Sequence, residues 1–112
     1  SMLSPGAHDE MIGFLSQLTH CIAISLMNCN QSDELAEYTG DSFRDLTRIA
    51  KINDALWSEL FLLNKEPLLR QMRAFEAELA SLRRTIEQDD RAALREKMKR
   101  STERRKIFDK TK

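Results

Sequence analysis

A run of apolar residues near the middle of the chain constrains the fold more than any other feature of this sequence. The apolar positions alternate steps of four and three residues, at Leu68, Met72, Phe75, Leu79, Leu82 and Ile86. This spacing is the seam of a heptad repeat, which keeps one face of an α-helix apolar along its length. The pattern is too short to establish a coiled coil. It predicts a long helix that packs lengthwise against a partner, either in the same chain or in a second copy.

The composition favours helices in the rest of the chain as well. Only three of the 112 residues are glycine and two are proline, which leaves little turn chemistry for β-hairpins. Eighteen basic residues balance eighteen acidic ones, so no overall field draws the chain to nucleic acid or to an anionic membrane. We therefore predict an all-α domain of about five to six helices, in which the long helix pairs into a dimer.

Capping residues mark where the predicted helices begin. Hydroxyl, carboxylate and amide side chains accept hydrogen bonds from the free N–H groups of a first helical turn. Such side chains stand at each expected helix start, namely Ser4, Asp41 or Ser42, Asn53-Asp54, Asn64, and Asp89 or Asp90. The first helix, opened by Pro5, is expected to reach about Asn28, and the helix that follows Asn53 is expected to end near Asn64.

Several functional classes are excluded by what the sequence lacks. No apolar run approaches the roughly 20 residues of a membrane span, so no membrane partner is expected. Cys21 and Cys29 lie roughly 12 Å apart along one predicted helix, beyond disulfide reach, which favours reduced cysteines in a cytoplasmic protein. His8 and His20 diverge by roughly 120° around that helix, so no metal site is predicted. There is no glycine-rich dinucleotide or phosphate loop either, so the chain alone is not expected to bind a nucleotide.

A cationic row is the first candidate binding feature. Arg44 and Arg48 stand four residues apart on one predicted helix and therefore share a face. Lys51 joins this face, and apolar residues cluster roughly opposite it: Phe43, Leu46 and Ala50. Such a row suits a small anion with more than one carboxylate. The alternative is a solvated face whose arginines pair with acidic neighbours.

Two ring residues are the other candidates. His20 lies between apolar neighbours in the first helix, and Trp57 is the only tryptophan. Taken alone, each is more simply explained by packing: His20 as a core histidine, and Trp57 as a core or interface residue.

The order of these residues resembles a known family. Residues 8–9 read His-Asp, residues 16–20 read Ser-Gln-Leu-Thr-His, residues 43–50 read Phe-Arg-Asp-Leu-Thr-Arg-Ile-Ala, and residues 56–64 read Leu-Trp-Ser-Glu-Leu-Phe-Leu-Leu-Asn. This pattern is similar to the C-terminal helical domain of prephenate dehydrogenase and its arogenate-using relatives, and the likeness extends to about Ile86. We expect residues 4–112 to be that domain and residues 1–3 to be a cloning remnant.

The resemblance implies an activity for the full-length enzyme. Family members oxidatively decarboxylate prephenate, a ring with two carboxylates, using NAD or NADP in tyrosine biosynthesis. An N-terminal Rossmann domain binds the cofactor, and it lies outside this sequence, so the present chain alone is expected to be inactive. The helical domain forms a homodimer and completes the substrate site.

The resemblance also implies residue roles. Arg48 would bind a substrate carboxylate, His20 would contact the substrate, and Arg44 would lie near the pocket. Trp57 would lie at the dimer interface, close to the partner's site. Many relatives have Ser-His-Leu-Pro-His where residues 16–20 have Ser-Gln-Leu-Thr-His, so no role of the earlier histidine passes to Gln17.

Three alternatives stay open at this point. In the first, the substrate of the full-length enzyme is arogenate rather than prephenate. In the second, the chain is a purely structural helical dimerisation module whose arginines are solvated. The third is a chorismate mutase, but such an enzyme would need catalytic arginines in its long first helix, and residues 11–27 contain none.

Overall fold

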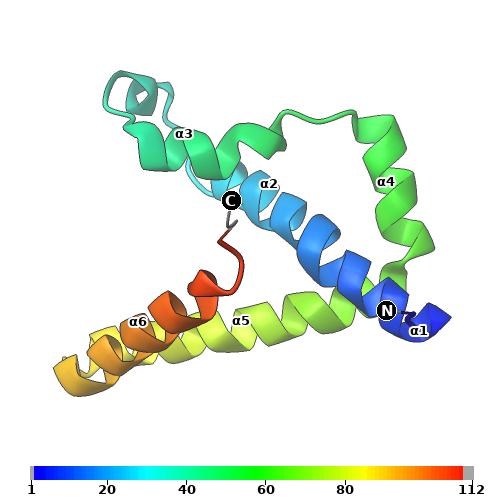
Figure 1. The fold of residues 1–112 in the computed structure, drawn as a ribbon. Helices are drawn as coiled ribbons and strands as arrows, with labels where there is room; N and C mark the ends of the chain where they lie inside the picture. The colour runs from blue at the N-terminus through cyan, green and yellow to red at the C-terminus, as the bar shows by residue number, and fades with distance from the viewer. Residues whose placement is uncertain (1, 110–112) are drawn as a thin grey trace. The chain divides into compact units, whose positions relative to one another are not determined.

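The computed structural model describes residues 2–109, and every element within them is helical. It comprises a first helix from Pro5 to Asn28, followed by α3 (Asp41–Thr47), α4 (Asp54–Leu63), α5 (Lys65–Glu87) and α6 (Arg91–Lys106) (Figure 1). Two short 3-10 turns, η2 (Asp33–Glu37) and η3 (Arg48–Ala50), flank α3. The predicted all-α class and the number of helices are confirmed. The chain divides into two compact units, one ending at Met72 and one beginning at Arg73.

The first helix has the predicted limits, but its middle segment is not α-helical as expected. The Ser4 hydroxyl accepts a hydrogen bond from the Ala7 N–H at 3.1 Å, and Pro5 occupies the first turn, as expected. Between α1 (Pro5–Ile12) and α2 (Thr19–Asn28) the backbone forms a π-helix, η1 (Gly13–Leu18). Such segments are uncommon and often occur at functional sites. No sequence pattern indicated it.

By length and composition alone, the helix Pro5–Asn28 is apolar enough to cross a membrane, contrary to the expectation that no run would qualify. The core helix of a folded domain passes the same test. Here the helix contributes the buried residues Leu18, Cys21 and Ala23, and its polar side chains bond to α4 and α5. We therefore describe it as the central helix of the first unit.

The segment that carries the arginines departs from the predicted pattern. Gly40 is the N-cap of α3, with no side-chain cap, so the prediction of Asp41 or Ser42 as cap is wrong. The α-helix also ends earlier than expected, because Thr47 leaves helical geometry (φ −100°, ψ 2°) and η3 begins at Arg48. Both α3 and η3 contact α2, so this segment packs on the C-terminal half of the first helix.

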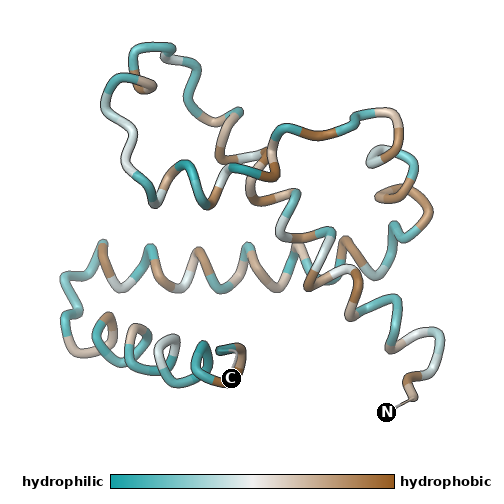
Figure 2. Tube along the Cα trace, turned by 45° about the horizontal axis from the view of Figure 1, so that its top comes forward, coloured by the Kyte–Doolittle hydropathy of each residue, from teal (hydrophilic) through white to brown (hydrophobic). Residues whose placement is uncertain are grey.

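The start of α4 follows prediction, whereas the start of α5 uses Asn64 differently. Asn53 caps α4 by accepting a hydrogen bond from the Leu56 N–H at 3.1 Å. Asn64 ends α4 as predicted, but its side chain turns to the first helix instead of capping α5. The alternation of apolar and polar residues along α5 is visible in Figure 2.

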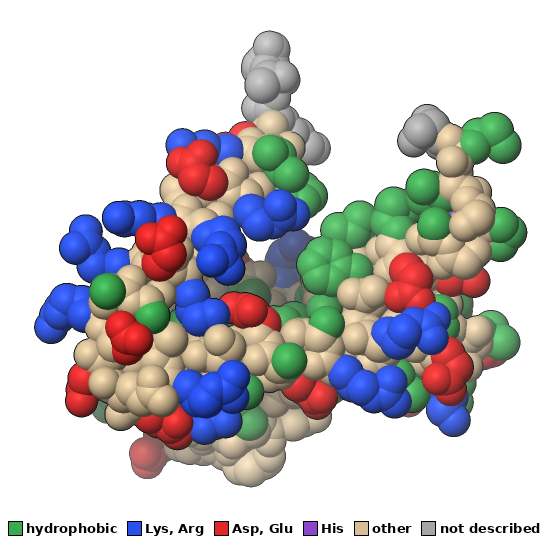
Figure 3. All heavy atoms as spheres, turned by 90° about the horizontal axis from the view of Figure 1, so that it is seen from below, with side chains coloured by type: hydrophobic (Ala, Val, Ile, Leu, Met, Phe, Trp, Pro, Cys, Tyr) green, Lys and Arg blue, Asp and Glu red, His purple; other side chains and the backbone are tan. Residues whose placement is uncertain are grey.

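In the second unit, the latter part of α5 is joined to α6 by a short polar turn. Asp89 adopts the left-handed conformation (φ 52°) there, and Asp90 caps α6 through a hydrogen bond from the Ala93 N–H at 3.0 Å. Lys97 bonds to Glu78 at 3.0 Å and so ties the two helices together. Side chains of both charge signs lie on the face drawn in Figure 3.

The heptad seam is buried at one end only. Leu68 is 4% exposed, whereas Leu79 is 53% exposed and Ile86 is 59% exposed. The long helix therefore forms as predicted, and the later part of its apolar face is left open within one chain.

Candidate functional site

His20 and Trp57 form an aromatic pair in the first unit. Their ring centroids lie 4.0 Å apart with an angle of 23° between the planes, so the imidazole stacks on the indole. Phe61 meets Trp57 edge-on, with ring centroids 5.9 Å apart. Both stacked residues are half-buried. The structure thus brings together two of the four residues selected from the sequence.

The imidazole of His20 is oriented by its own helix. Its Nδ1 lies 2.7 Å from the Ser16 carbonyl oxygen, and a carbonyl only accepts, so Nδ1 is the nitrogen that carries the proton. Nε2 makes no hydrogen bond within residues 2–109. A histidine held in this way presents its second nitrogen to a ligand.

Arg44 is already engaged by its own segment. Its guanidinium donates a hydrogen bond to the Thr39 carbonyl oxygen at 3.0 Å and lies 4.0 Å from the Asp41 carboxylate. It also lines a hollow of about 790 Å³, together with Lys51 and the apolar side chains of Leu26, Leu35 and Phe43. The hollow therefore combines apolar side chains with two cations, and the acidic Asp33 also lines it.

Arg48 is exposed and makes no hydrogen bond or ion pair with any residue in the described range 2–109. It opens the 3-10 turn and does not line the hollow that Arg44 and Lys51 share. A single α-helical face was expected to hold all three cations. The change of helix type at Thr47 alters the angular spacing, so Arg48 departs from that row.

A second hollow, of about 330 Å³, lies beside the aromatic pair. Trp57 and Phe61 line it, with Ile24 from the first helix and Ile52 from the loop before α4. Met27 and Ala50 line both hollows, which makes them neighbours. Within the part of the chain that the structure describes, no group of three metal-binding side chains occurs.

Two polar residues connect the first helix to α4: Gln17, which the sequence reasoning left without a role, and Asn64, which it assigned as a helix cap. Gln17 is 5% exposed, and its Nε2 donates a hydrogen bond to the Leu60 carbonyl oxygen at 3.1 Å. Asn64 donates to Gln17 Oε1 at 2.8 Å and to the Asp9 carbonyl oxygen at 3.1 Å. The sequence feature that could have indicated this contact is the amide of Gln17 among apolar residues of the first helix, because a buried amide requires hydrogen-bond partners.

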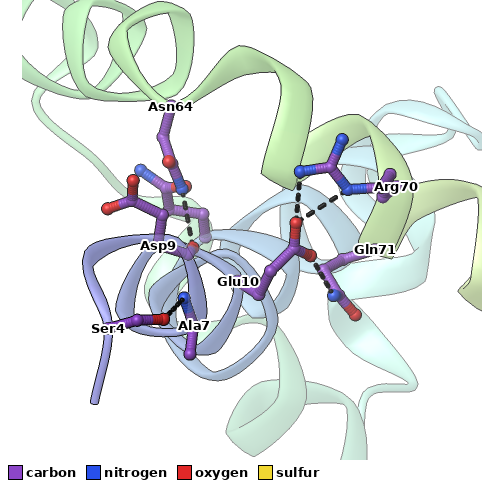
Figure 4. Close-up of polar contacts among 8 residues, drawn as sticks. Ser4, Ala7, Asp9, Glu10, Asn64, Arg70 and Gln71 are labelled. Carbon is purple, nitrogen blue, oxygen red and sulfur yellow. Dashed lines mark hydrogen bonds and ion pairs between the residues drawn. The ribbon is translucent and has the colours of Figure 1, made fainter.

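A third contact joins the first helix to α5 (Figure 4). Glu10 accepts hydrogen bonds from Arg70, with Nε at 2.7 Å, and from Gln71 Nε2 at 2.7 Å. These bonds, from Arg70 first and Gln71 second, lower the pKa of the Glu10 carboxyl below its ordinary value. Elsewhere in the helix, burial raises the pKa of the Cys21 thiol, and neither cysteine forms a disulfide.

Comparison with known proteins shows which family the chain resembles. Residues 4–100 match the model of the prephenate dehydrogenase dimerization domain. The chain is 33% identical over 107 residues to a cyclohexadienyl dehydrogenase of Zymomonas mobilis, which covers 90% of this chain and 36% of the relative. It is 30% identical over 93 residues to a prephenate dehydrogenase of Bacillus subtilis, covering 79% of this chain and 25% of the relative.

A solved structure shows the same fold. The prephenate dehydrogenase of A. aeolicus, in complex with hydroxyphenyl propionate and NAD+, superposes with a TM-score of 0.88 at 32% identity. The match covers 97% of this chain and 40% of that one. The present chain thus spans well under half the length of these relatives. By the match over residues 4–100, this chain belongs to the prephenate dehydrogenase family and corresponds to its dimerization domain.

Proposed function

We propose that this chain is the C-terminal domain of a cytoplasmic prephenate dehydrogenase, which oxidatively decarboxylates prephenate with NAD or NADP in tyrosine biosynthesis. The proposal is supported by the family match and by the activities for which the two relatives are named. Further support comes from the A. aeolicus structure, which holds an aryl propionate and NAD+. In this proposal the domain forms a homodimer and supplies contacts to the substrate, while the redox chemistry occurs elsewhere in the enzyme.

The observation that carries the proposal is the free guanidinium of Arg48. An arginine presents a planar fork of donors that matches a carboxylate, and it loses affinity for a ligand when a neighbouring acid already occupies it. Arg48 is exposed and is unpaired within residues 2–109, whereas Arg44 is tied to Thr39 and Asp41. We therefore assign the substrate carboxylate to Arg48 and a supporting cationic position to Arg44.

The ring residues complete the proposed site. Nε2 of His20 is the group offered to the substrate, because Nδ1 is committed to Ser16. Trp57 stacks on one face of that imidazole. In this proposal Trp57 also lies at the dimer interface, close to the partner's site. Two rings and a cation suit an anion with a flat hydrocarbon body.

The cofactor would bind outside this chain. A dinucleotide pyrophosphate is held at a glycine-rich turn between a β-strand and a helix. The described residues 2–109 contain no β-strand, and the sequence has no glycine-rich turn of that kind. NAD or NADP would supply the hydride acceptor from a preceding Rossmann domain, and the present chain alone would not turn over.

Substrate binding to the full-length enzyme tests the assignment of Arg48. Because a hydrogen-bonded charge pair contributes about 1.5–3 kcal/mol, Arg48→Ala is expected to weaken prephenate binding by about 10- to 100-fold. Arg83→Ala is the matched control, since Arg83 is an exposed helical arginine paired only with Glu87. Equal prephenate affinity in Arg48→Ala and the control would reject the assignment and favour a purely structural dimerisation module.

Arogenate is the second candidate substrate. The name of the Zymomonas mobilis relative, cyclohexadienyl dehydrogenase, favours a site that is not restricted to prephenate. Titrating the same enzyme with prephenate and with arogenate distinguishes the two candidates. If the enzyme prefers arogenate, Arg48 would bind a carboxylate of arogenate instead of one of prephenate.

A further inference from the structure

The first helix and α4 run antiparallel with a definite register. Residues later in the first helix contact residues earlier in the α4 segment. Asp9 and Gln17 bond to Asn64, Gln17 bonds to Leu60, and His20 stacks on Trp57. Trp57 and Leu60 lie three residues apart on α4 and therefore share a face of that α-helix, whereas Gln17 and His20 lie three residues apart where η1 passes into α2. The Gln17 contact and the aromatic stack are thus three residues apart on both helices, and together they define one register.

Gln17 is the only residue of this series with a buried side chain, and it makes two hydrogen bonds to the α4 segment. Its amide donates to the Leu60 carbonyl oxygen, which belongs to the last turn of α4, and accepts from the Asn64 side chain at the C-cap of α4. The Leu60 carbonyl oxygen also accepts a hydrogen bond from the Asn64 backbone N–H at 3.3 Å, so the Gln17 amide adds a second bond at the end of α4. Sliding or rotating α4 would leave a buried amide without partners, which is costly, whereas ring stacking tolerates small shifts.

We propose that Gln17 is a positioning residue, which holds α4 in the register that places Trp57 on the imidazole of His20. The effect of this register on the substrate site rests on the proposed function, which assigns His20 and Trp57 to that site. The register itself does not depend on that function. The π-helical segment that contains Gln17 supports it, since π-helical turns occur preferentially where a helix serves a site.

The test uses the near-ultraviolet circular dichroism of Trp57, the only tryptophan in the chain. Gln17→Met keeps the length of the side chain and removes both hydrogen bonds. It is expected to abolish the indole band that arises from fixed stacking, while the helical signal persists. His20→Ala provides the reference spectrum for a lost stack.

Gln71→Met is the matched control. Gln71 is a half-buried glutamine that bonds to Glu10 and joins the first helix to α5. The same substitution there removes the same amide chemistry but does not touch α4, so the Trp57 band is expected to persist. A general loss of packing would weaken the band in both variants, and that result would overturn the proposal, as would an unchanged band in Gln17→Met.

If Gln17→Met does not fold, Gln17→Ala replaces it, because this smaller side chain also removes the hydrogen bonds to Leu60 and Asn64. A weakened Trp57 band then supports the proposal, and an unchanged band overturns it. Neither measurement involves substrate. Failure of the Arg48 test would therefore leave this inference standing, and failure here would leave the assignment of Arg48 intact.

Discussion

Glu10 and Arg70 join the first helix to α5 across 60 residues of sequence. The guanidinium donates to one carboxylate oxygen of Glu10 through Nε and Nη2, while Gln71 donates to the other oxygen. All three side chains come from helices that the sequence predicted, but the pairing between them depends on the tertiary fold. The contact stabilises the ionised form of Glu10 and so makes stability depend on pH.

Acid is expected to weaken the fold through Glu10. The folded-state pKa of this carboxyl lies below its ordinary value of 4.5, so its stabilising contribution is complete above that pH. The contribution is lost as the pH falls through the lower, folded-state pKa. Urea unfolding midpoints measured from neutral pH into the acid range should therefore fall less steeply for Glu10→Gln than for the parent chain. Glu76→Gln, an exposed change on α5, should follow the parent, and a parallel decline in all three would contradict the prediction.

Removing the stacked imidazole should cost stability. His20→Ala loses the contact with Trp57, and aromatic pairs contribute about 0.5–1.5 kcal/mol beyond burial. His8→Ala is the control, since that side chain is 58% exposed and its Nδ1 lies 4.0 Å from the Asp9 carboxylate. Urea unfolding at a fixed protein concentration compares the two. Equal midpoints would mean that the stack contributes nothing to the fold.

Gly13 is expected to tolerate alanine. Gly13 opens the π-helix η1, but its own backbone angles are right-handed helical (φ −58°, ψ −42°), and an added Cβ would lie 3.5 Å from the Pro67 backbone, a normal van der Waals distance. Glycine costs about 0.5–1 kcal/mol relative to alanine inside a helix, so Gly13→Ala should stabilise the chain by up to that amount. Thermal unfolding measures it. Gly13→Val, which adds bulk beyond Cβ, should lower the melting temperature, and a similar loss with alanine would show that α5 approaches too closely.

The two ends of the heptad seam should respond differently to the same truncation. Leu68 is 4% exposed, so Leu68→Ala should destabilise the chain by about 2–5 kcal/mol. Leu79 is 53% exposed within one chain, so Leu79→Ala should change the stability of one protomer by less than about 0.5 kcal/mol. Because the family match identifies a dimerization domain, we expect Leu79→Ala to weaken self-association instead. Sedimentation equilibrium and denaturant unfolding, run on both variants, separate the two effects.

Local features of the fold followed from the sequence because they depend on neighbours along the chain. Ser4, Asn53 and Asp90 cap their helices as predicted, since a cap involves residues three positions apart. The end of α3 did not follow, because Thr47 leaves helical geometry where the segment packs on α2. Asn64 was also misjudged: its amide bonds to the first helix, a partner that no local pattern identifies.

The sequence by itself determined the helical class, the helix limits to within a few residues, and the residues that mark the family. Only the tertiary structure decided which of those residues meet. Helical spacing shows which side chains share a face, but not which helix will cover it. That choice depends on long-range contacts such as Gln17 with Leu60 and His20 with Trp57, where the packing of two helices sets the register.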